Sequence, residues 1–271
     1  MSMHFITAPF RLMLGLFSFI SMIVSVILIY LLVAPAKQRQ TAIASAKGFF
    51  SKLLLRAFNF KVEYFGQYEP ESGLIISNHV SWVDVLLLSD KPNLHFVAKS
   101  EVKDWPIIGF LTQILGTLFI RRENKFQVYR SLPKAQALLK KKETVMVFPE
   151  GTTTTGENTT QFFPMMFEIA VREDGLVQPM AIRYWNSKGE ISHQAAFIDE
   201  DGIMQSIGRL LLEKVTYAQV HFLAALDASK MNRKELAQHC RQQIQNSLEA
   251  ARPPEASMSS DSKRLLSSRA R

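Results

Sequence analysis

Apolar and polar positions divide the chain into two parts. Positions 12–33 carry no charged residue, and about 22 such residues would extend roughly 33 Å as a helix, which matches the hydrocarbon core of a bilayer. This run predicts a transmembrane helix. The next stretch places Ile43, Ala46, Phe50, Leu53 and Leu54 at helical spacing, with basic residues mostly elsewhere on the helical wheel. It predicts an amphipathic helix that lies on a membrane surface or packs on a domain core.

After position 58, short apolar runs of strand type alternate with helical patterns. The strand-like runs lie at 62–65, 73–77, 95–98, 118–121, 145–148, 177–183 and 219–223, and the helical ones at 83–89, 107–115, 126–142, 164–172, 204–214 and 233–249. This alternation predicts an α/β domain with a mainly buried sheet. We therefore expect a membrane anchor at 1–58, a folded domain at 59–251, and a disordered basic tail at 252–271.

Charge and cysteine content narrow the classes of partner. The net charge is +8, which favours anionic partners. The chain has no nucleic-acid motif and no basic stripe with interleaved aromatic residues, so we expect an anionic membrane surface and no nucleic acid. Cys240 is the only cysteine, which excludes an internal disulfide and a cysteine-rich zinc site.

Basic residues around the first apolar run predict its orientation. Arg11 precedes the run, whereas Lys37, Arg39, Lys47, Lys52 and Arg56 follow it. The positive-inside bias places the folded domain on the cytoplasmic side of a cell inner membrane or an equivalent membrane. Ala34-Pro35-Ala36 has the form of a signal-peptide cleavage site, but the apolar run is longer than a usual signal sequence.

The candidate chemistry begins where one apolar run ends. Asn78-His79-x-Ser81-x-x-Asp84 follows the strand-like run 73–77 and precedes a helical one. A histidine at such a turn can act as a general base, and a carboxylate can hold its ring in one tautomer. The alternative interpretation is structural, because Ser81-x-x-Asp84 before an apolar run is also a capping box.

Three later segments extend this first motif. They are Gly116-Thr-Leu-Phe-Ile-Arg121-Arg122, Val147-Phe-Pro-Glu150-Gly151-Thr152 and the run 177–182. The four motifs in this order resemble the glycerolipid acyltransferase family, which includes 1-acylglycerol-3-phosphate acyltransferases, over about residues 60–225. The resemblance implies a central mixed sheet flanked by helices, after the transmembrane and amphipathic helices, and makes 59–251 an acyltransferase domain.

The resemblance also implies a reaction. A membrane-bound O-acyltransferase would move a fatty acyl group from acyl-coenzyme A or acyl carrier protein to the free hydroxyl of lysophosphatidic acid, giving phosphatidic acid. His79 would be the base and Asp84 would orient it. The reaction needs no cofactor and no metal. The expected partners are therefore the lysophospholipid acceptor, one of these two acyl donors and the lipid bilayer.

Substrate-binding residues are implied by the same motifs. Lys99 and Arg122 match cations that hold a phosphate, Arg121 stands where many members carry Asp, and Glu150 and Gly151 match residues that bind the glycerol part. Asn78, Ser81 and Thr152 complete the predicted set. Two positions depart from acylglycerol-phosphate enzymes, because Thr153 and Pro164 stand where basic residues are frequent.

Three alternatives remain open at the level of sequence. The acceptor could be another lysolipid, such as lyso-ornithine lipid, since some of its acyltransferases also carry Thr at the position of Thr153. Ser81 could be the nucleophile of a serine hydrolase, although the G-x-S-x-G motif is absent. The chain could also be a non-catalytic membrane protein that binds lipid.

Overall fold

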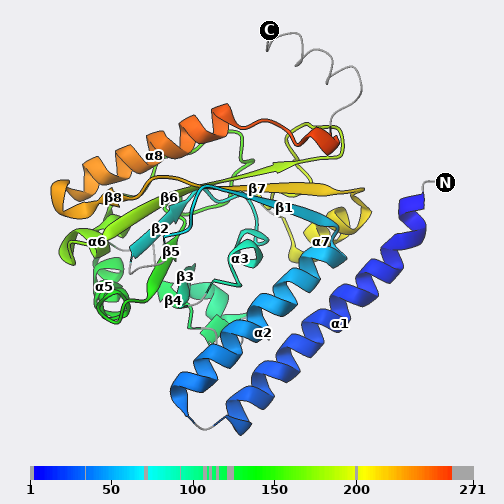
Figure 1. Ribbon diagram of the computed structural model, residues 1–271, viewed down its shortest axis with the longest axis horizontal. Coiled ribbons are helices and arrows are strands. Elements are labelled where there is room, and N and C mark those ends of the chain that lie inside the picture. Colours follow the sequence, from blue (N-terminus) through cyan, green and yellow to red (C-terminus); the bar gives the residue numbers. More distant parts are fainter. Residues whose placement is uncertain are drawn as a thin grey trace.

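We describe the fold from a computed structural model of the chain. It describes residues 3–33, 35–69, 73–91, 93–105, 109, 112–113, 116–120, 125–198 and 201–257. Helices α1 (Met3–Leu32) and α2 (Ala36–Ala57) form an antiparallel hairpin beside the rest of the chain (Figure 1). The segment Thr7–Leu32 is long and apolar enough to cross a membrane.

The hairpin pairs along its length and is joined to the domain at one end. Arg11 of α1 bonds to Ala57 of α2, Ser18 bonds to Phe50, and the Arg39 guanidinium lies 4.8 Å from the ring centre of Tyr30. Arg11 also donates to main-chain oxygens at the end of α7 (Ile203–Leu212), including that of Leu211 at 2.7 Å. The start of α1 is therefore fixed to the domain.

One mixed sheet forms the centre of the domain. Its order is β1 (Phe60–Phe65), β7 (Thr216–Phe222), β6 (Leu176–Trp185), β2 (Gly73–Ser77), β5 (Thr144–Val147), β3 (Leu94–Lys99) and β4 (Leu118–Ile120), and β8 (Leu226–Asp227) also pairs with β6. The β6–β7 and β6–β8 pairs are antiparallel and the others are parallel. This confirms the α/β domain that the residue pattern predicts and the mixed sheet flanked by helices that the family resemblance implies.

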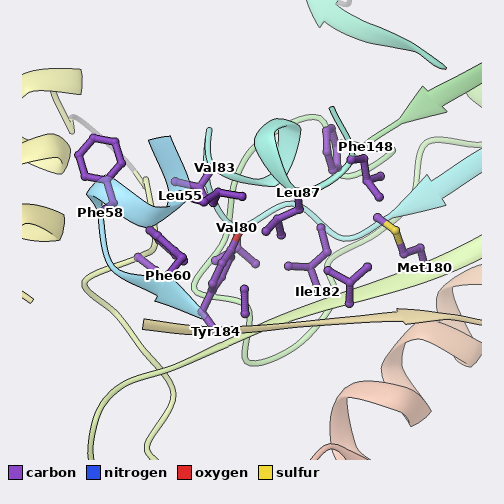
Figure 2. Packing of buried hydrophobic residues seen from close by; sticks show 14 of the residues in the cluster. Leu55, Phe58, Phe60, Val80, Val83, Leu87, Phe148, Met180, Ile182 and Tyr184 are labelled. Atoms are coloured by element: carbon purple, nitrogen blue, oxygen red, sulfur yellow. The ribbon is translucent and has the colours of Figure 1, made fainter. Parts of the chain in front are cut away.

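Strand residues alternate between two buried faces of the sheet. Ile75 points into a cluster with Leu55 of α2 and Leu87 of α3 (Asp84–Leu87), part of which is drawn in Figure 2. Leu74 and Ile76 point into the opposite cluster. That second face is covered by α5 (Lys125–Lys140), α6 (Glu168–Arg172) and α8 (Arg233–Ala250). A strand buried on both faces reads as a continuous apolar run, as the run 73–77 does.

Most predicted elements are present with small shifts in their ends. The basic amphipathic helix is longer than predicted, since α2 begins at Ala36, and the predicted helix 164–172 is a 3₁₀ turn, Pro164–Phe167, followed by α6. Further 3₁₀ turns span Ser100–Asp104 and Ala228–Lys230. Of the predicted helix 107–115, only residues 109, 112 and 113 are described, and they are helical.

The predicted disordered tail begins later than the composition indicated. After α8 the chain continues to a 3₁₀ turn at Glu255–Ser257, and Ser257 is buried with its hydroxyl bonded to the Pro254 carbonyl at 2.6 Å. Residues 252–257 are therefore structured, because backbone contacts hold a segment whose composition alone suggests disorder. The rest of the predicted tail, 258–271, lies outside the described residues.

Candidate active site

The two strongest sequence motifs emerge at one edge of the sheet. The segment with His79 and Asp84 follows β2, and the segment with Glu150 follows β5. Strands β2 and β5 are adjacent and parallel, with Ile76 opposite Val147. Carboxyl ends of parallel strands meet at one edge, which is where sites form in sheets of this kind. The topology thus brings together two motifs that lie about seventy residues apart.

His79 and Asp84 form a hydrogen-bonded pair. The Nδ1 atom of His79 lies 2.7 Å from Oδ2 of Asp84, and the Asp84 side chain has no exposed surface. The same Oδ2 atom accepts the backbone N–H groups of Val80 at 2.8 Å and Ser81 at 3.1 Å. One carboxylate oxygen therefore closes the turn and holds the imidazole, so a structural role and a catalytic role of Asp84 are compatible.

Tyr184 completes the surroundings of the carboxylate and was not predicted as a site residue. Its hydroxyl donates to Oδ1 of Asp84 at 2.6 Å from the neighbouring long strand β6. Burial, followed by the negative charge of Asp84, raises the pKa of Tyr184 well above its usual value, so the phenol remains a donor. The sequence holds no signal for this contact beyond a tyrosine in an apolar strand.

The ring of His79 is fixed in place yet reachable from solvent. It stacks on Phe148 with ring centres 3.9 Å apart, and its side chain is 20% exposed. Donation from Nδ1–H to Asp84 leaves the lone pair on Nε2, for which no hydrogen-bond partner occurs among the described residues. This is the tautomer that can accept a proton from a bound hydroxyl group.

Glu150 supports the backbone of the turn that carries His79. Its Oε2 atom accepts the N–H of His79 at 2.9 Å and its Oε1 atom accepts the N–H of Thr160 at 2.8 Å. Burial raises the pKa of Glu150, although these backbone donors oppose the shift. The N–H of Thr154 donates to the His79 carbonyl at 2.8 Å. Glu150 and Thr154 therefore bond to the N–H and to the carbonyl of His79, respectively.

Gly151 and Thr152 follow at the rim of the site. Gly151 has a φ of +76°, and a Cβ atom there would lie 2.7 Å from the ring of Phe163. Both facts favour glycine, because a side chain would strain this left-handed conformation and would have to displace the Phe163 ring. Thr152 is exposed next to it, and is the motif residue that remains open to solvent.

Two residues predicted to bind substrate are fully buried. Asn78 is fully buried, and its amide bonds to both the N–H (2.8 Å) and the carbonyl (2.9 Å) of Ile182, so it ties the end of β2 to β6. Ser81 is also fully buried, and its hydroxyl has no hydrogen-bond partner among the described residues. The prediction that the Ser81 hydroxyl caps a helix is wrong, and an inaccessible hydroxyl does not suit a hydrolase nucleophile.

Of the three basic residues predicted to bind substrate, only Lys99 lies within the described residues. Lys99 ends β3, is 54% exposed, and forms an ion pair of 2.8 Å with Glu101. Ile120 lies opposite Lys99 in the β3–β4 register, whereas Arg121 and Arg122 lie outside the described residues. Across the described part of the chain, no three His, Cys, Asp or Glu side chains gather in a way that could hold a metal ion.

Comparison with known proteins adds the family context. Residues 59–183 match a family model described as Acyltransferase. The lyso-ornithine lipid O-acyltransferase of Pseudomonas aeruginosa is 33% identical over 80% of this chain and 81% of the relative. The 1-acyl-sn-glycerol-3-phosphate acyltransferase of Neisseria gonorrhoeae is 27% identical over 72% of this chain and 75% of the relative.

A solved structure supports the fold. The crystal structure of PlsC from Thermotoga maritima, a 1-acyl-sn-glycerophosphate acyltransferase, superposes with a TM-score of 0.66 at 20% identity. The match covers 91% of this chain and 97% of that protein. At this identity the likeness shows the fold alone.

Proposed function

Because this chain belongs to the acyltransferase family, we propose that it transfers a fatty acyl group from a thioester to a lysolipid hydroxyl, with His79 as general base. The observation that carries this proposal is the 2.7 Å contact between His79 Nδ1 and the fully buried Asp84. The acyl donor is a thioester of coenzyme A or of acyl carrier protein. Both donors present the same reacting carbonyl and the same thiolate leaving group.

In the proposed reaction one proton passes through His79. Its Nε2 atom takes the proton of the acceptor hydroxyl as that oxygen attacks the thioester carbonyl. The C–S bond then breaks, and the imidazolium returns the proton to the departing thiolate sulfur. Asp84 stays ionised, stabilises the imidazolium and fixes the ring. Asp84 is itself held by the Tyr184 hydroxyl and two backbone N–H groups.

The acceptor that we propose is lyso-ornithine lipid, in place of the lysophosphatidic acid expected above. A phosphate monoester carries close to two negative charges, whereas an ornithine headgroup carries one ammonium and one carboxylate. Thr153 and Pro164 remove two positive charges from the motif region, and the Thr153 hydroxyl bonds to the Phe197 carbonyl. The relative from Pseudomonas aeruginosa acts on lyso-ornithine lipid by its name.

Lysophosphatidic acid is the second candidate, because Lys99 and Arg122 match the cations that hold a phosphate in acylglycerol-phosphate enzymes. The relative from Neisseria gonorrhoeae carries that activity in its name. Lys99 forms an exposed ion pair with Glu101, and the negative charge of Glu101 offsets the positive charge of Lys99. We therefore place this acceptor second.

We also propose that the α1–α2 hairpin attaches the domain to the cytoplasmic side of a membrane. α1 exposes large apolar residues such as Phe10, Phe17 and Leu31. α2 runs beside it and carries five basic residues, which are costly in a bilayer core. In place of the transmembrane helix expected above, the pairing favours a hairpin that lies along the membrane surface, with the apolar side of α1 in the lipid.

The test is an acyl-transfer assay on the purified full-length protein in mixed micelles. Lyso-ornithine lipid and lysophosphatidic acid are each offered with acyl-coenzyme A and with acyl carrier protein thioester. The expected result is transfer to lyso-ornithine lipid that His79→Ala abolishes. Preference for lysophosphatidic acid would overturn the acceptor, and absence of transfer to any lysolipid would overturn the reaction.

A further inference from the structure

Helix α7 presents apolar groups on its outer side. Met204 is 72% exposed and Leu212 is 52% exposed, and they lie eight residues apart on the helix. Gly208 lies halfway between them, and a Cβ atom there would meet nothing within 4 Å. Positions four residues apart share one side of a helix. Met204, Gly208 and Leu212 therefore form an uncovered apolar stripe, while Leu210 and Leu211 are buried.

This stripe continues the apolar surface of α1. The Arg11 guanidinium binds the carbonyls of Leu211 at 2.7 Å and Glu213 at 2.9 Å, which flank Leu212 in the chain. Phe10, next to Arg11, is 70% exposed. In Figure 1, α7 lies beside α1 near the end of the hairpin that joins the domain. The Arg11 contacts thus place the end of the α7 stripe beside the start of α1.

Basic residues border the same junction. Lys214 follows the stripe and Arg56 precedes Ala57, which accepts the Arg11 Nε–H at 3.0 Å; both are exposed. Apolar residues with basic neighbours match a membrane interface, where aliphatic groups enter the acyl region and cations face anionic headgroups.

We infer that the Met204–Gly208–Leu212 stripe of α7 is a second membrane-contact surface, which fits a bilayer containing anionic lipids. The inference rests on the membrane attachment proposed for the hairpin. A single contact through α1 leaves the domain free to rotate about that helix. A second contact on α7 fixes the tilt of the domain on the membrane.

The tilt matters because α7 is bonded to the catalytic turn. Nε1 of Trp82 donates to the Ser206 hydroxyl of α7 at 3.0 Å, and Trp82 lies between His79 and Asp84 in the chain. The N–H of Phe197, in the segment that leads to α7, donates to the Val80 carbonyl at 2.9 Å. A membrane that holds α7 therefore holds the turn that carries the base.

The chain suits a single-site fluorescence test. Cys240 is fully buried, and burial raises the pKa of its thiol to about 12, so an introduced cysteine is the reactive one. Met204→Cys and Leu212→Cys are labelled with an environment-sensitive dye. Phe17→Cys on exposed α1 is the positive control, and Gln238→Cys on exposed α8, over the opposite face of the sheet, is the negative control.

Each labelled protein is mixed with vesicles of phosphatidylglycerol and phosphatidylethanolamine that contain nitroxide-labelled lipid. We expect blue-shifted emission and quenching at positions 17, 204 and 212, and neither at 238. Quenching at 17 with aqueous behaviour at 204 and 212 would overturn the second contact alone. Aqueous behaviour at all four positions would overturn the attachment of the hairpin together with the second contact.

A double variant, Met204→Glu with Leu212→Glu, tests the consequence. Both residues are exposed, so we expect an unchanged melting temperature and normal transfer to acceptor in detergent micelles. Vesicle partitioning should fall about tenfold, as expected when two partly inserted apolar side chains are replaced by charged ones. Equal partitioning of the variant and the unaltered protein would contradict the inference, whatever acceptor the enzyme uses.

Discussion

Tyr184 and Asp84 are joined by a buried hydrogen bond of 2.6 Å although one hundred residues separate them in the chain. The donor lies on β6 and the acceptor at the start of α3. The bond holds the Oδ1 atom of Asp84, while the Oδ2 atom holds His79 and two backbone N–H groups. Tyr184 is therefore a positioning residue, since it acts on His79 through Asp84.

Removing the Tyr184 hydroxyl should change turnover more than substrate binding. We expect Tyr184→Phe to lower kcat by about tenfold or more, the equivalent of one lost charge-assisted hydrogen bond of about 1.5–3 kcal/mol, with KM little changed. Tyr217→Phe, on buried β7, is the control that should leave both kcat and KM unchanged.

Replacing Asp84 should reduce both activity and stability. In Asp84→Asn the site loses the charge that stabilises the imidazolium, and an amide can hold the wrong tautomer, so kcat should fall by about 10⁴. The same oxygen receives the N–H groups of Val80 and Ser81, so unfolding should become easier by about 1–3 kcal/mol. Measured kcat and melting temperature give both values, and a stable, active variant would contradict the proposed base.

Glu150→Gln separates support of His79 from binding of the acceptor. Both carboxylate oxygens of Glu150 accept hydrogen bonds from backbone N–H groups. In the Gln variant the side-chain NH₂ group would face one of these backbone N–H groups, so one of the two hydrogen bonds would be lost. We expect kcat to fall and KM for the acceptor to stay within about threefold of its original value, because binding is not the lost function. A large rise in KM with normal kcat would instead assign Glu150 to acceptor binding.

The raised pKa of Glu150 also predicts a pH dependence of stability. The folded state holds the Glu150 proton more tightly than the unfolded state, whose pKa is near 4.5. The stability that Glu150 contributes is therefore present below pH 4.5 and is lost as the pH rises through the folded-state pKa. Denaturant titrations over this range should show the original protein losing stability with rising pH relative to Glu150→Gln.

Arg11 should be necessary for α1 to pack against α2 and the end of α7. It donates to Ala57, Leu210, Leu211 and Glu213 main-chain oxygens, a planar pattern that Lys cannot reproduce. We expect Arg11→Lys to lower the free energy of unfolding in detergent by at least about 1.5–3 kcal/mol. Lys52→Ala, which removes an exposed ion pair with Asp90, should cost less than about 1 kcal/mol.

Thr153→Arg tests the acceptor preference. It restores the basic residue that acylglycerol-phosphate enzymes often carry at this position and breaks the Thr153 bond to Phe197. We expect kcat/KM for lysophosphatidic acid to rise relative to lyso-ornithine lipid by about tenfold, the value of roughly 1.4 kcal/mol from one new cation near phosphate. Thr153→Ala is the matched control, and an equal change for both acceptors would show that position 153 has no role in selection.

The order of elements and the contact between His79 and Asp84 followed from the sequence by itself. His79 and Asp84 are five residues apart at the end of an apolar run, so a single local turn brings them together. The alternation of strands and helices predicted the α/β sheet for the same reason, because burial on two faces imposes an apolar pattern that can be read from consecutive residues. The long apolar run of α1 is equally local.

Only the tertiary structure decided which partners surround that pair. The contacts of Asn78 with Ile182, of Asp84 with Tyr184 and of Arg11 with α7 join residues about one hundred to two hundred positions apart. Each depends on the register and order of strands in the sheet or on docking of the N-terminal hairpin. Local patterns of polarity do not specify the strand register, the strand order or the docking of the hairpin. An apolar face indicates that it is buried, but it does not indicate which element covers it.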